Sequence, residues 1–361
     1  MLHVTHMSKL RVLLVGLGSM GVIMATALDM SDDWELVAAA DPLEANRFRF
    51  AERHRRVQMF ADSSEACSKE FLDRFEIDFV AIASPPNTHA KLSILVLEAG
   101  RHVLCEKPLA VSKFEAAGMV DFAAVHSSSL ALVDFQMRFN LARRWLRDCV
   151  FKGTIGSPML VTAVGGYPAM IGSPWTWWSD LASGGGVLNE YGSHIVDLLL
   201  WIFGPAERAD GLLRTGERER RYGNGVRNVD SDDITCFHLT WSSGLVADVV
   251  LSTYLRPGPR RLEVHGELGS VVVDEQDVVT HFDGNKGIVV GSGARETIQS
   301  LIGAQIDTYT PPFVRMISEI ADAVRDHREP VDAATFSDGL RVIQLLDEVR
   351  ASSNMRIGGS S

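Results

Sequence analysis

The first third of the chain alternates short apolar runs with longer segments of helical pattern. The apolar runs are continuous, which is typical of strands buried on both faces of a parallel sheet. The predicted strands are Leu10–Val15, Glu35–Ala40, Gln58–Phe60, Phe79–Ala83, His102–Cys105 and Ala131–Asp134. The predicted helices between them are Gly21–Met30, Glu44–His54, Ser63–Phe75, His89–Ala99 and Ser112–His126. Strands and helices that alternate at this spacing predict βαβ units and a doubly wound parallel sheet.

The pattern changes beyond Asp134, where strands follow one another without helices between them. The predicted strands are Met159–Val164, Ala209–Arg214, Ile234–Trp241, Leu245–Tyr254, Arg261–His265 and Ser270–Asp274. The predicted helices are Leu141–Phe151, Leu188–Phe203, Pro312–Asp326 and Ser337–Ser352, and Gly216–Asp233 is predicted as a solvated loop. Consecutive strands with tight links are typical of antiparallel pairing. We therefore expect an α/β protein with a Rossmann-type domain over residues 1–135 and an α+β domain over 136–361, built on an open, mainly antiparallel sheet.

Composition narrows the possible partners. The chain has 361 residues and a formal net charge of −11, which disfavours nucleic acid because such binders present a basic face to phosphates. No segment has the pattern of a signal peptide or a membrane span. The four cysteines have no metal-type or redox-type spacing, so we expect no metal site and isolated thiols in a reducing compartment. A cytoplasmic protein that binds neither nucleic acid nor membrane is expected.

Residues 16–21 read Gly-Leu-Gly-Ser-Met-Gly, directly after the first predicted strand and at the start of a helix. Gly16 permits a tight turn, Gly18 lets the backbone approach a diphosphate, and Gly21 permits close packing of helix against strand. The helix N-terminus supplies N–H groups and partial positive charge for phosphate. A glycine-rich turn without a ligand is the alternative, but the strand and helix on either side favour dinucleotide binding.

Asp41 ends the second predicted strand, 20 residues after Gly21. A carboxylate at this point accepts hydrogen bonds from the adenosine ribose and repels a 2′-phosphate, which favours NAD over NADP. A helix N-cap before Pro42 is the alternative for the same residue. Arg47 and Arg49 follow closely and leave NADP as the less favoured cofactor.

Glu106-Lys107-Pro108 follows the fifth predicted strand. A lysine at the carboxyl end of a parallel strand points toward the crevice in which ligands bind. Its ammonium could stabilise the oxyanion that develops as a hydride leaves an alcohol. A surface lysine in a turn is the alternative.

These motifs, taken together, resemble the Gfo/Idh/MocA family of glucose–fructose oxidoreductase and inositol dehydrogenase. The resemblance rests on the glycine turn and on four further segments. These segments are Ser84-Pro85-Pro86-Asn87-Thr88-His89, Gly100-Arg101-His102-Val103 with Glu106-Lys107-Pro108, residues 184–197 and residues 264–270. The resemblance runs from about residue 9 to residue 352, and its motifs are specific in combination.

The resemblance implies nicotinamide-dependent oxidation or reduction of sugars, polyols or their derivatives. It implies that Lys107 contacts substrate, and that Glu190 and His194 occupy the positions of the acid and the histidine in the family motif D-x-G-x-H. His194 would accept the proton of the oxidised hydroxyl. The cofactor residues expected on this basis are Gly16, Gly18, Ser19, Met20, Gly21, Asp41, Ser84, Pro85, Asn87, His89, Glu106 and Lys107.

The spacing of Glu190 and His194 is also meaningful without the family. They are four positions apart on a predicted helix and therefore share a face, and Asp197 lies three positions after His194. A carboxylate beside an imidazole favours the protonated imidazole, which suits a base in alcohol oxidation. A structural histidine is the alternative. Glu190 stands where the family usually has Asp. Its side chain is one methylene longer, which weakens the inference of this protein's substrate from those of the family.

Three further residues are predicted to bind substrate together with Lys107, Glu190 and His194. Gln136 and Arg138 follow the sixth strand and could hydrogen-bond hydroxyls, although structural bonds at a hinge are an equal alternative. Trp175 lies in an irregular stretch before the glycine run and could stack on a sugar ring, or pack under a loop or at a subunit interface.

The sequence thus predicts an NAD-dependent dehydrogenase that acts on a secondary alcohol of a sugar or cyclitol. The catalytic residues would be Lys107, His194 and Glu190. Two other hypotheses stay open: a catalytically silent NAD-binding regulator, and a glycoside hydrolase that uses transient oxidation. A reductase of a non-sugar ring is more remote. The open sheet suggests a homodimer or homotetramer.

Overall fold

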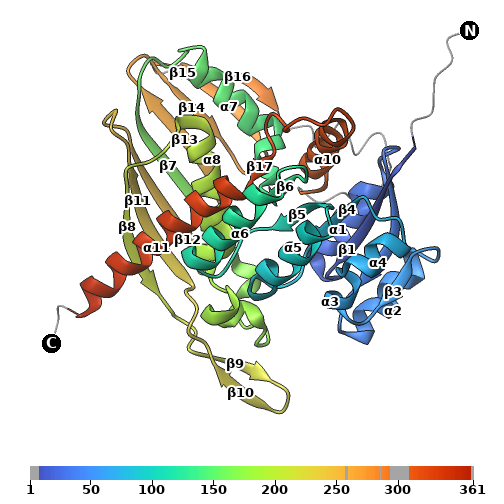
Figure 1. Cartoon of the computed structure of the whole chain (residues 1–361). Helices are drawn as coiled ribbons and strands as arrows, with labels where there is room; N and C mark the ends of the chain where they lie inside the picture. The colour runs from blue at the N-terminus through green and yellow to red at the C-terminus, as the bar shows by residue number, and fades with distance from the viewer. Residues whose placement is uncertain (1–7, 257–258, 285, 293–308, 359–361) are drawn as a thin grey trace, which may run out of the picture. The chain divides into compact units, whose positions relative to one another are not determined.

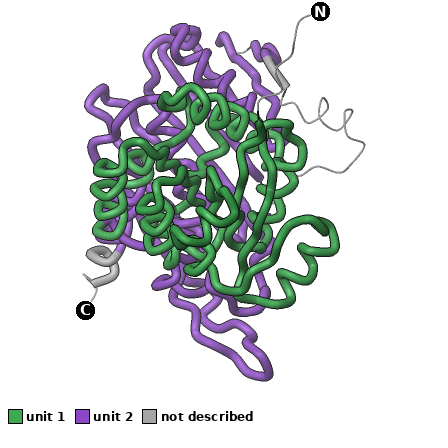
Figure 2. The backbone as a smooth tube through the Cα atoms, turned by 45° about the vertical axis from the view of Figure 1, so that its right-hand side comes forward, with its two compact units in different colours: residues 1–110, 114–139, 304–340 green, residues 111–113, 140–303, 341–361 purple. Residues whose placement is uncertain are grey.

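The computed structural model describes residues 8–256, 259–284, 286–292 and 309–358. The chain forms two compact units (Figure 2). The first comprises residues 1–110, 114–139 and 304–340, and the second comprises 111–113, 140–303 and 341–361. The sequence placed a single boundary at residue 135. The chain leaves the first unit after Phe139, and residues 304–340, expected in the second domain, belong to the first unit.

The first unit is built on a seven-stranded sheet in the order β17-β6-β5-β4-β1-β2-β3 (Figure 1). The strands are β1 (Leu10–Val15), β2 (Trp34–Ala40), β3 (Gln58–Phe60), β4 (Phe79–Ile82), β5 (His102–Glu106), β6 (Ala131–Asp134) and β17 (Ala334–Thr335). All neighbours pair in parallel except β17, which is antiparallel to β6. The predicted doubly wound parallel sheet is confirmed. The carboxyl ends of β1, β2, β4, β5 and β6 therefore share one edge.

Helices of the first unit pack on this sheet. They are α1 (Ser19–Asp29), α2 (Glu44–Arg53), α3 (Ser63–Ala66), α4 (Lys69–Arg74), α5 (His89–Glu98), α6 (Lys113–Val125) and α10 (Thr310–Arg325). The apolar face of α10 explains why it joins this unit: Phe313, Met316 and Ile317 are buried in one core with Met24 and Leu28 of α1. Trp34 of β2 also donates from its indole to the Ile317 carbonyl, 3.1 Å away.

The second unit contains an eight-stranded sheet in the order β16-β15-β14-β13-β7-β12-β11-β8 (Figure 1). The strands are β7 (Pro158–Gly166), β8 (Arg208–Arg214), β11 (Ile234–Thr240), β12 (Val246–Ser252), β13 (Arg260–Gly266), β14 (Ser270–Val273), β15 (Val278–Asp283) and β16 (Lys286–Ser292). Pairing is antiparallel except between β7 and β12, which is parallel. The expected open, mainly antiparallel sheet is confirmed. Its helices are α7 (Leu141–Phe151), α8 (Ser193–Phe203) and most of α11 (Phe336–Gly358).

Two local predictions were wrong, and two strands were not predicted. The segment Gly216–Asp233 contains the hairpin of β9 (Glu219–Tyr222) and β10 (Gly225–Asn228), because a turn at Gly223 with positive φ pairs two charged strands. The single helix predicted over 63–75 breaks between α3 and α4, where the hydroxyl of Ser68 accepts from the Phe71 N–H and starts a new helix. β15 and β16 lie where no strand was predicted.

None of the helices in the described ranges combines the length and apolarity that crossing a bilayer requires. Within the same ranges, no group of three or more His, Cys, Asp or Glu side chains is arranged to hold a metal ion.

Candidate active site

The glycine turn links β1 to α1 in the first unit, and its first and third glycines are fixed by contact with backbone. Gly16 has φ +91°, and a Cβ there would lie 2.5 Å from the Ala83 carbonyl group. A Cβ on Gly21 would lie 2.0 Å from the Gly16 oxygen. Both positions therefore exclude side chains, as the motif predicts. The turn and the segment after β4 are thereby held against each other.

Gly18 differs from the other two glycines. A Cβ at Gly18 would meet nothing within 4 Å, and Gly18, the N-cap residue of α1, has no side chain that could cap the helix. The first turn of α1 contains no acidic residue. Open space above uncapped N–H groups suits an approaching diphosphate. The turn therefore fits the cofactor expected at Gly16, Gly18, Ser19, Met20 and Gly21.

Asp41, which follows β2, is hydrogen-bonded to the glycine turn. Its Oδ2 accepts from the Leu17 N–H at 2.8 Å and from the Asn46 side-chain amide at 3.0 Å, and its Oδ1 accepts from the Leu43 N–H at 2.8 Å. The side chain is 5% exposed. The N-cap position of α2 is Leu43, so Asp41 does not cap that helix. Its carboxylate is fixed beside the glycine turn, where the fingerprint places the ribose contact.

The two arginines that could have served a 2′-phosphate are engaged locally. The Arg47 guanidinium donates to the backbone oxygens of Asp41 and Pro42, at 2.6 and 3.0 Å. Arg49 donates to the Asn46 amide oxygen at 2.6 Å. Asn46 was not predicted. It links Asp41 to α2, and its place five residues after Asp41 was the signal available in the sequence.

His89, the first residue of α5, contacts the segment that follows β4. Its Nδ1 is 3.0 Å from the Pro108 oxygen, and its Nε2 is 2.8 Å from the Ser84 oxygen. Complete burial lowers the pKa of His89 to about 4. The ring thus joins the loops after β4 and β5, and it is a structural tie between two groups of predicted cofactor residues. Ser84 itself is hydrogen-bonded through its hydroxyl to Thr88, at 2.6 Å.

Glu106 and Lys107 stand at the carboxyl end of β5, as predicted, and Lys107 precedes Pro108 through a cis peptide bond. Both side chains are buried. The Lys107 N–H donates to Glu106 Oε2 at 3.0 Å. The Lys107 side chain is thus buried at the edge of the sheet where doubly wound folds bind ligands, and its contact with substrate stays a prediction.

Gln136 and Arg138 lie in the short helix after β6, and both contact other residues of the first unit. With its amide oriented to donate, the Gln136 side chain lies 3.1 Å from Asp134 Oδ1. The Arg138 guanidinium donates to the Asp332 oxygen at 3.3 Å and lies 3.7 Å from the Asp338 carboxylate. These are the structural bonds that the sequence left as the alternative, and substrate contact by either residue stays a prediction.

In the second unit, Glu190 lies on a π-helix over Leu188–Gly192 that continues directly into α8, and His194 is the second residue of α8. π-Helical turns inside α-helices are frequent at functional sites. His194 and Asp197 are buried, and Glu190 is half-buried. The predicted single helix over 188–203 therefore begins with a wider turn.

Long-range contacts fix the start of this helix. Asp232 accepts from the Leu188 N–H at 2.9 Å through Oδ2, and its carbonyl accepts from the Val187 N–H at 3.0 Å. The Asn189 side-chain amide donates to the Gly184 and Gly185 oxygens, at 3.0 and 3.2 Å. The Arg350 guanidinium of α11 donates to the Asn189 amide oxygen. The roles of Asp232, Asn189 and Arg350 in holding the π-helix were not predicted, because each of these residues contacts a residue that is distant in the sequence.

Trp175 packs against the β9–β10 hairpin. Its indole donates to the Asn228 oxygen at 3.0 Å, its backbone N–H donates to the Arg221 oxygen at 2.7 Å, and the Arg227 guanidinium lies 3.6 Å from a ring centroid. Tyr222 makes an edge contact with the same ring. This is the packing role that the sequence left open beside sugar stacking.

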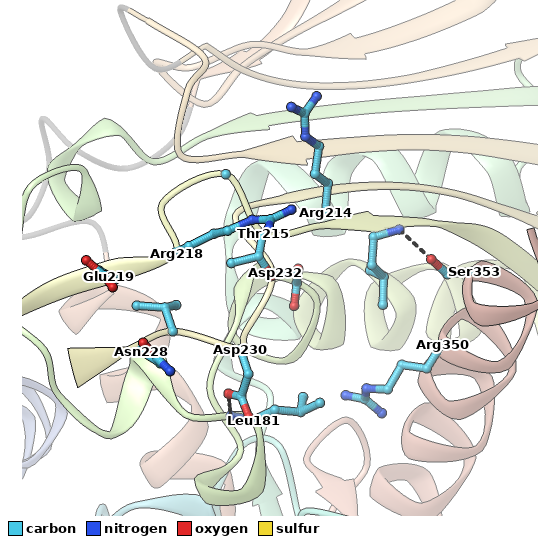
Figure 3. A pocket seen from close by; sticks show the side chains of 13 residues that line it. Leu181, Arg214, Thr215, Arg218, Glu219, Asn228, Asp230, Asp232, Arg350 and Ser353 are labelled. Atoms are coloured by element: carbon cyan, nitrogen blue, oxygen red, sulfur yellow. Dashed lines mark hydrogen bonds between the residues drawn. The ribbon is translucent and has the colours of Figure 1, made fainter. Parts of the chain in front are cut away.

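A cavity of about 1090 Å³ opens in the second unit between the hairpin, the end of β8 and α11 (Figure 3). Its inner wall includes Asp232 and Arg350, which hold the π-helix from this side. Arg214, Arg218 and Asp230 lie around it. None of the predicted catalytic residues lines this cavity.

Comparison with known proteins agrees with this geometry. The sequence model described as "Oxidoreductase family, NAD-binding Rossmann fold" matches residues 10–133, and that of the GFO/IDH/MocA C-terminal domain matches residues 143–272. The glucose-fructose oxidoreductase domain-containing protein 2 of Xenopus laevis is 27% identical over 298 residues, 77% of this chain and 76% of that protein. The levoglucosan dehydrogenase of Pseudarthrobacter phenanthrenivorans is 28% identical over 290 residues, 74% of each.

Solved structures share the fold. The oxidoreductase domain protein from Kribbella flavida has a TM-score of 0.84 at 26% identity, over 97% of this chain and 98% of that one. A levoglucosan dehydrogenase in complex with NADH and levoglucosan has a TM-score of 0.84 at 22% identity, over 96% and 98%. With an NAD-binding Rossmann domain and the matching C-terminal domain in one chain, this protein belongs to the Gfo/Idh/MocA family of oxidoreductases.

Proposed function

We propose that the protein is an NAD-dependent dehydrogenase that oxidises a secondary alcohol of a sugar, a cyclitol or a related polyol. One observation carries the proposal: the cofactor-type turn with its fixed Asp41 and the buried Lys107 stand at one edge of the same parallel sheet. This edge is where doubly wound folds bind ligands. Lys107 belongs to the first unit and His194 to the second, so their meeting at one substrate is part of the proposal.

Each proposed catalytic residue has a chemical task. Bound NAD would supply the hydride acceptor, so that the alcohol R₂CHOH loses a hydride and a proton and becomes the ketone R₂C=O. His194 would take the hydroxyl proton as a general base. Lys107 would stabilise the oxygen as it becomes anionic. Glu190 would orient His194 or hold a neighbouring hydroxyl of the substrate.

The cofactor preference follows from the engaged side chains. Asp41 presents a fixed carboxylate where a 2′-phosphate would be repelled. Arg47 and Arg49 are occupied by backbone and amide oxygens, which favours NAD over NADP.

The substrate class is proposed from the resemblance and from the relatives. One relative is named levoglucosan dehydrogenase, and a solved structure of a levoglucosan dehydrogenase is a complex with NADH and L-sorbose. Both names specify sugar-type molecules. The decisive experiment measures NADH formation with a panel of aldoses, ketoses, inositols, anhydrosugars and sugar acids. NADH accumulation with at least one member supports the proposal, whereas cofactor binding without turnover would favour a silent regulator. Release of free sugar from a glycoside with constant NADH would favour the hydrolase.

We further propose that the outer face of the second unit's sheet carries the contact with a second copy of the chain. Leu212, Cys236, Val250 and Val164 follow one another across β8, β11, β12 and β7 in register. Leu212, on the edge strand β8, is 45% exposed, and Val250, on the inner strand β12, is 37% exposed, so the two apolar side chains are open on this face. Sedimentation of Val250→Glu should show a shift to smaller species, and an unchanged mass would reject this interface.

A further inference from the structure

Two acidic side chains lie side by side in the first unit, at the carboxyl ends of β5 and β6. Glu106 and Asp134 are register partners in the parallel pair. They are 4% and 0% exposed, and partners in register on parallel neighbouring strands direct their side chains to the same face of the sheet. Two buried carboxylates side by side cannot both be ionised without a large cost, because burial and the repulsion of like charges both oppose the second charge. The pair therefore holds at least one proton.

The remaining contacts of the pair suit a single negative charge. Glu106 Oε2 accepts from the Lys107 N–H at 3.0 Å, and Asp134 Oδ1 accepts from the Gln136 N–H at 3.2 Å. The Gln136 amide, oriented to donate, adds a bond of 3.1 Å to that same oxygen. Donors to a carboxylate favour its charged form, whereas burial opposes it. Burial is the larger effect, and it raises the pKa of Asp134 to about 6.

Lys107 is a cation that acts on this pair. The positive charge of Lys107 stabilises the Asp134 carboxylate. His89, on α5, is neutral near pH 7, because burial and the neighbouring Lys107 lower its pKa. Cys105, which precedes Glu106, is a buried thiol whose pKa is raised by burial and by Glu106, Asp134 and Glu115, so it is also neutral. The Lys107 charge and the negative charge of the pair therefore stabilise each other.

We propose that the Glu106–Asp134 pair, holding one proton, is the counter-charge that positions the Lys107 ammonium for catalysis, with Asp134 as a positioning residue. The inference rests on the proposed function. If both acids were ionised, a net negative charge would oppose the oxyanion that Lys107 must stabilise. If both were protonated, the buried ammonium would lose its counter-charge. The singly protonated pair avoids both states near neutral pH.

The first test detects the proton without any turnover. Infrared spectra of the whole protein at pH 7.5 should show the carbonyl stretch of a protonated carboxyl group, with and without NADH. The band should be absent from Glu106→Gln and from Asp134→Asn, because an amide can donate to the remaining carboxylate and leave it ionised. Glu115→Gln is the matched control and should keep the band. A wild-type spectrum without this band, or a band that survives both substitutions, would overturn the proposal.

The second test separates positioning from folding. With an identified substrate, Asp134→Asn should lower kcat/KM by about tenfold at pH 7.5. The same substitution should remove the ionisation near pH 6 from the pH profile of kcat. The acid limb that remains would belong to His194, and NADH affinity should stay within about twofold. A variant that melts earlier but keeps the wild-type pH profile would show that Asp134 is only structural. If no substrate is found, the proposed function fails, and the infrared result still decides whether the pair holds a proton.

Discussion

The glycine turn of the first unit and the π-helix of the second both place polar groups at the start of a helix, but contacts of different range hold them. The turn is fixed by glycines five residues apart and by Asp41, 24 residues beyond Leu17. The π-helix is held by Asp232, 44 residues beyond Leu188, and by Arg350, 161 residues beyond Asn189. A turn of local origin can be recognised in a sequence, whereas the distant contacts that hold the π-helix cannot.

The largest expected effect concerns His194, the proposed general base on α8. His194→Ala should lower kcat by about 10²- to 10⁴-fold, the usual contribution of a positioned general base. NADH affinity, measured by fluorescence titration, should not change, because the cofactor residues are proposed to lie in the first unit. Near-normal kcat on an identified substrate would show that the base has been assigned to the wrong residue.

A side chain at Gly21 should disrupt the glycine turn by a steric clash. Gly21→Ala would put a Cβ 2.0 Å from the Gly16 oxygen, so we expect loss of NADH binding and a free energy of unfolding lower by several kcal/mol, about 3. Gly118→Ala in α6 is the matched control. Its Cβ would meet nothing within 4 Å, and the protein should gain up to about 1 kcal/mol. Equal melting temperatures for the two variants would contradict the packing described here.

At acidic pH, two buried groups of the first unit should change the stability of the protein in opposite directions. The pKa of His89 is lowered to about 4, so its contribution to stability is lost as the pH falls from about 6.5 toward 4. The pKa of Asp134 is raised to about 6, so its contribution has the opposite sign and grows as the pH falls through the same range.

Removal of the Asp134 carboxyl group should therefore leave the loss of stability caused by protonation of His89 without an opposing effect. Denaturant titrations should show that the stability of Asp134→Asn falls more steeply than that of the wild type between pH 6.5 and 4, by about 3 kcal/mol. Parallel curves for the two proteins would mean that Asp134 has an ordinary pKa in the folded state.

The smallest expected effect concerns the distant support of the π-helix. Asp232→Asn removes the charge that accepts from the Leu188 N–H, so kcat should fall by about tenfold while NADH affinity stays unchanged. Asp230→Asn is the control, since Asp230 is exposed and accepts from Leu181 outside the helix. Equal kcat values for both variants would show that the π-helix keeps its geometry without this charge.

The sequence by itself determined the parts whose causes are local. Continuous apolar runs specified the parallel strands, since burial on both faces requires them, and glycines without room for a Cβ specified the ligand turn. Glu106, Lys107 and His194 were found because a motif places them at an element's end. The tertiary structure decided the rest: α10 joins the first unit, Asp134 meets Glu106 across a strand pair, and Asp232 and Arg350 hold a helix from distant segments. These contacts depend on which elements pack together, and a periodicity read along the chain carries no information about that choice.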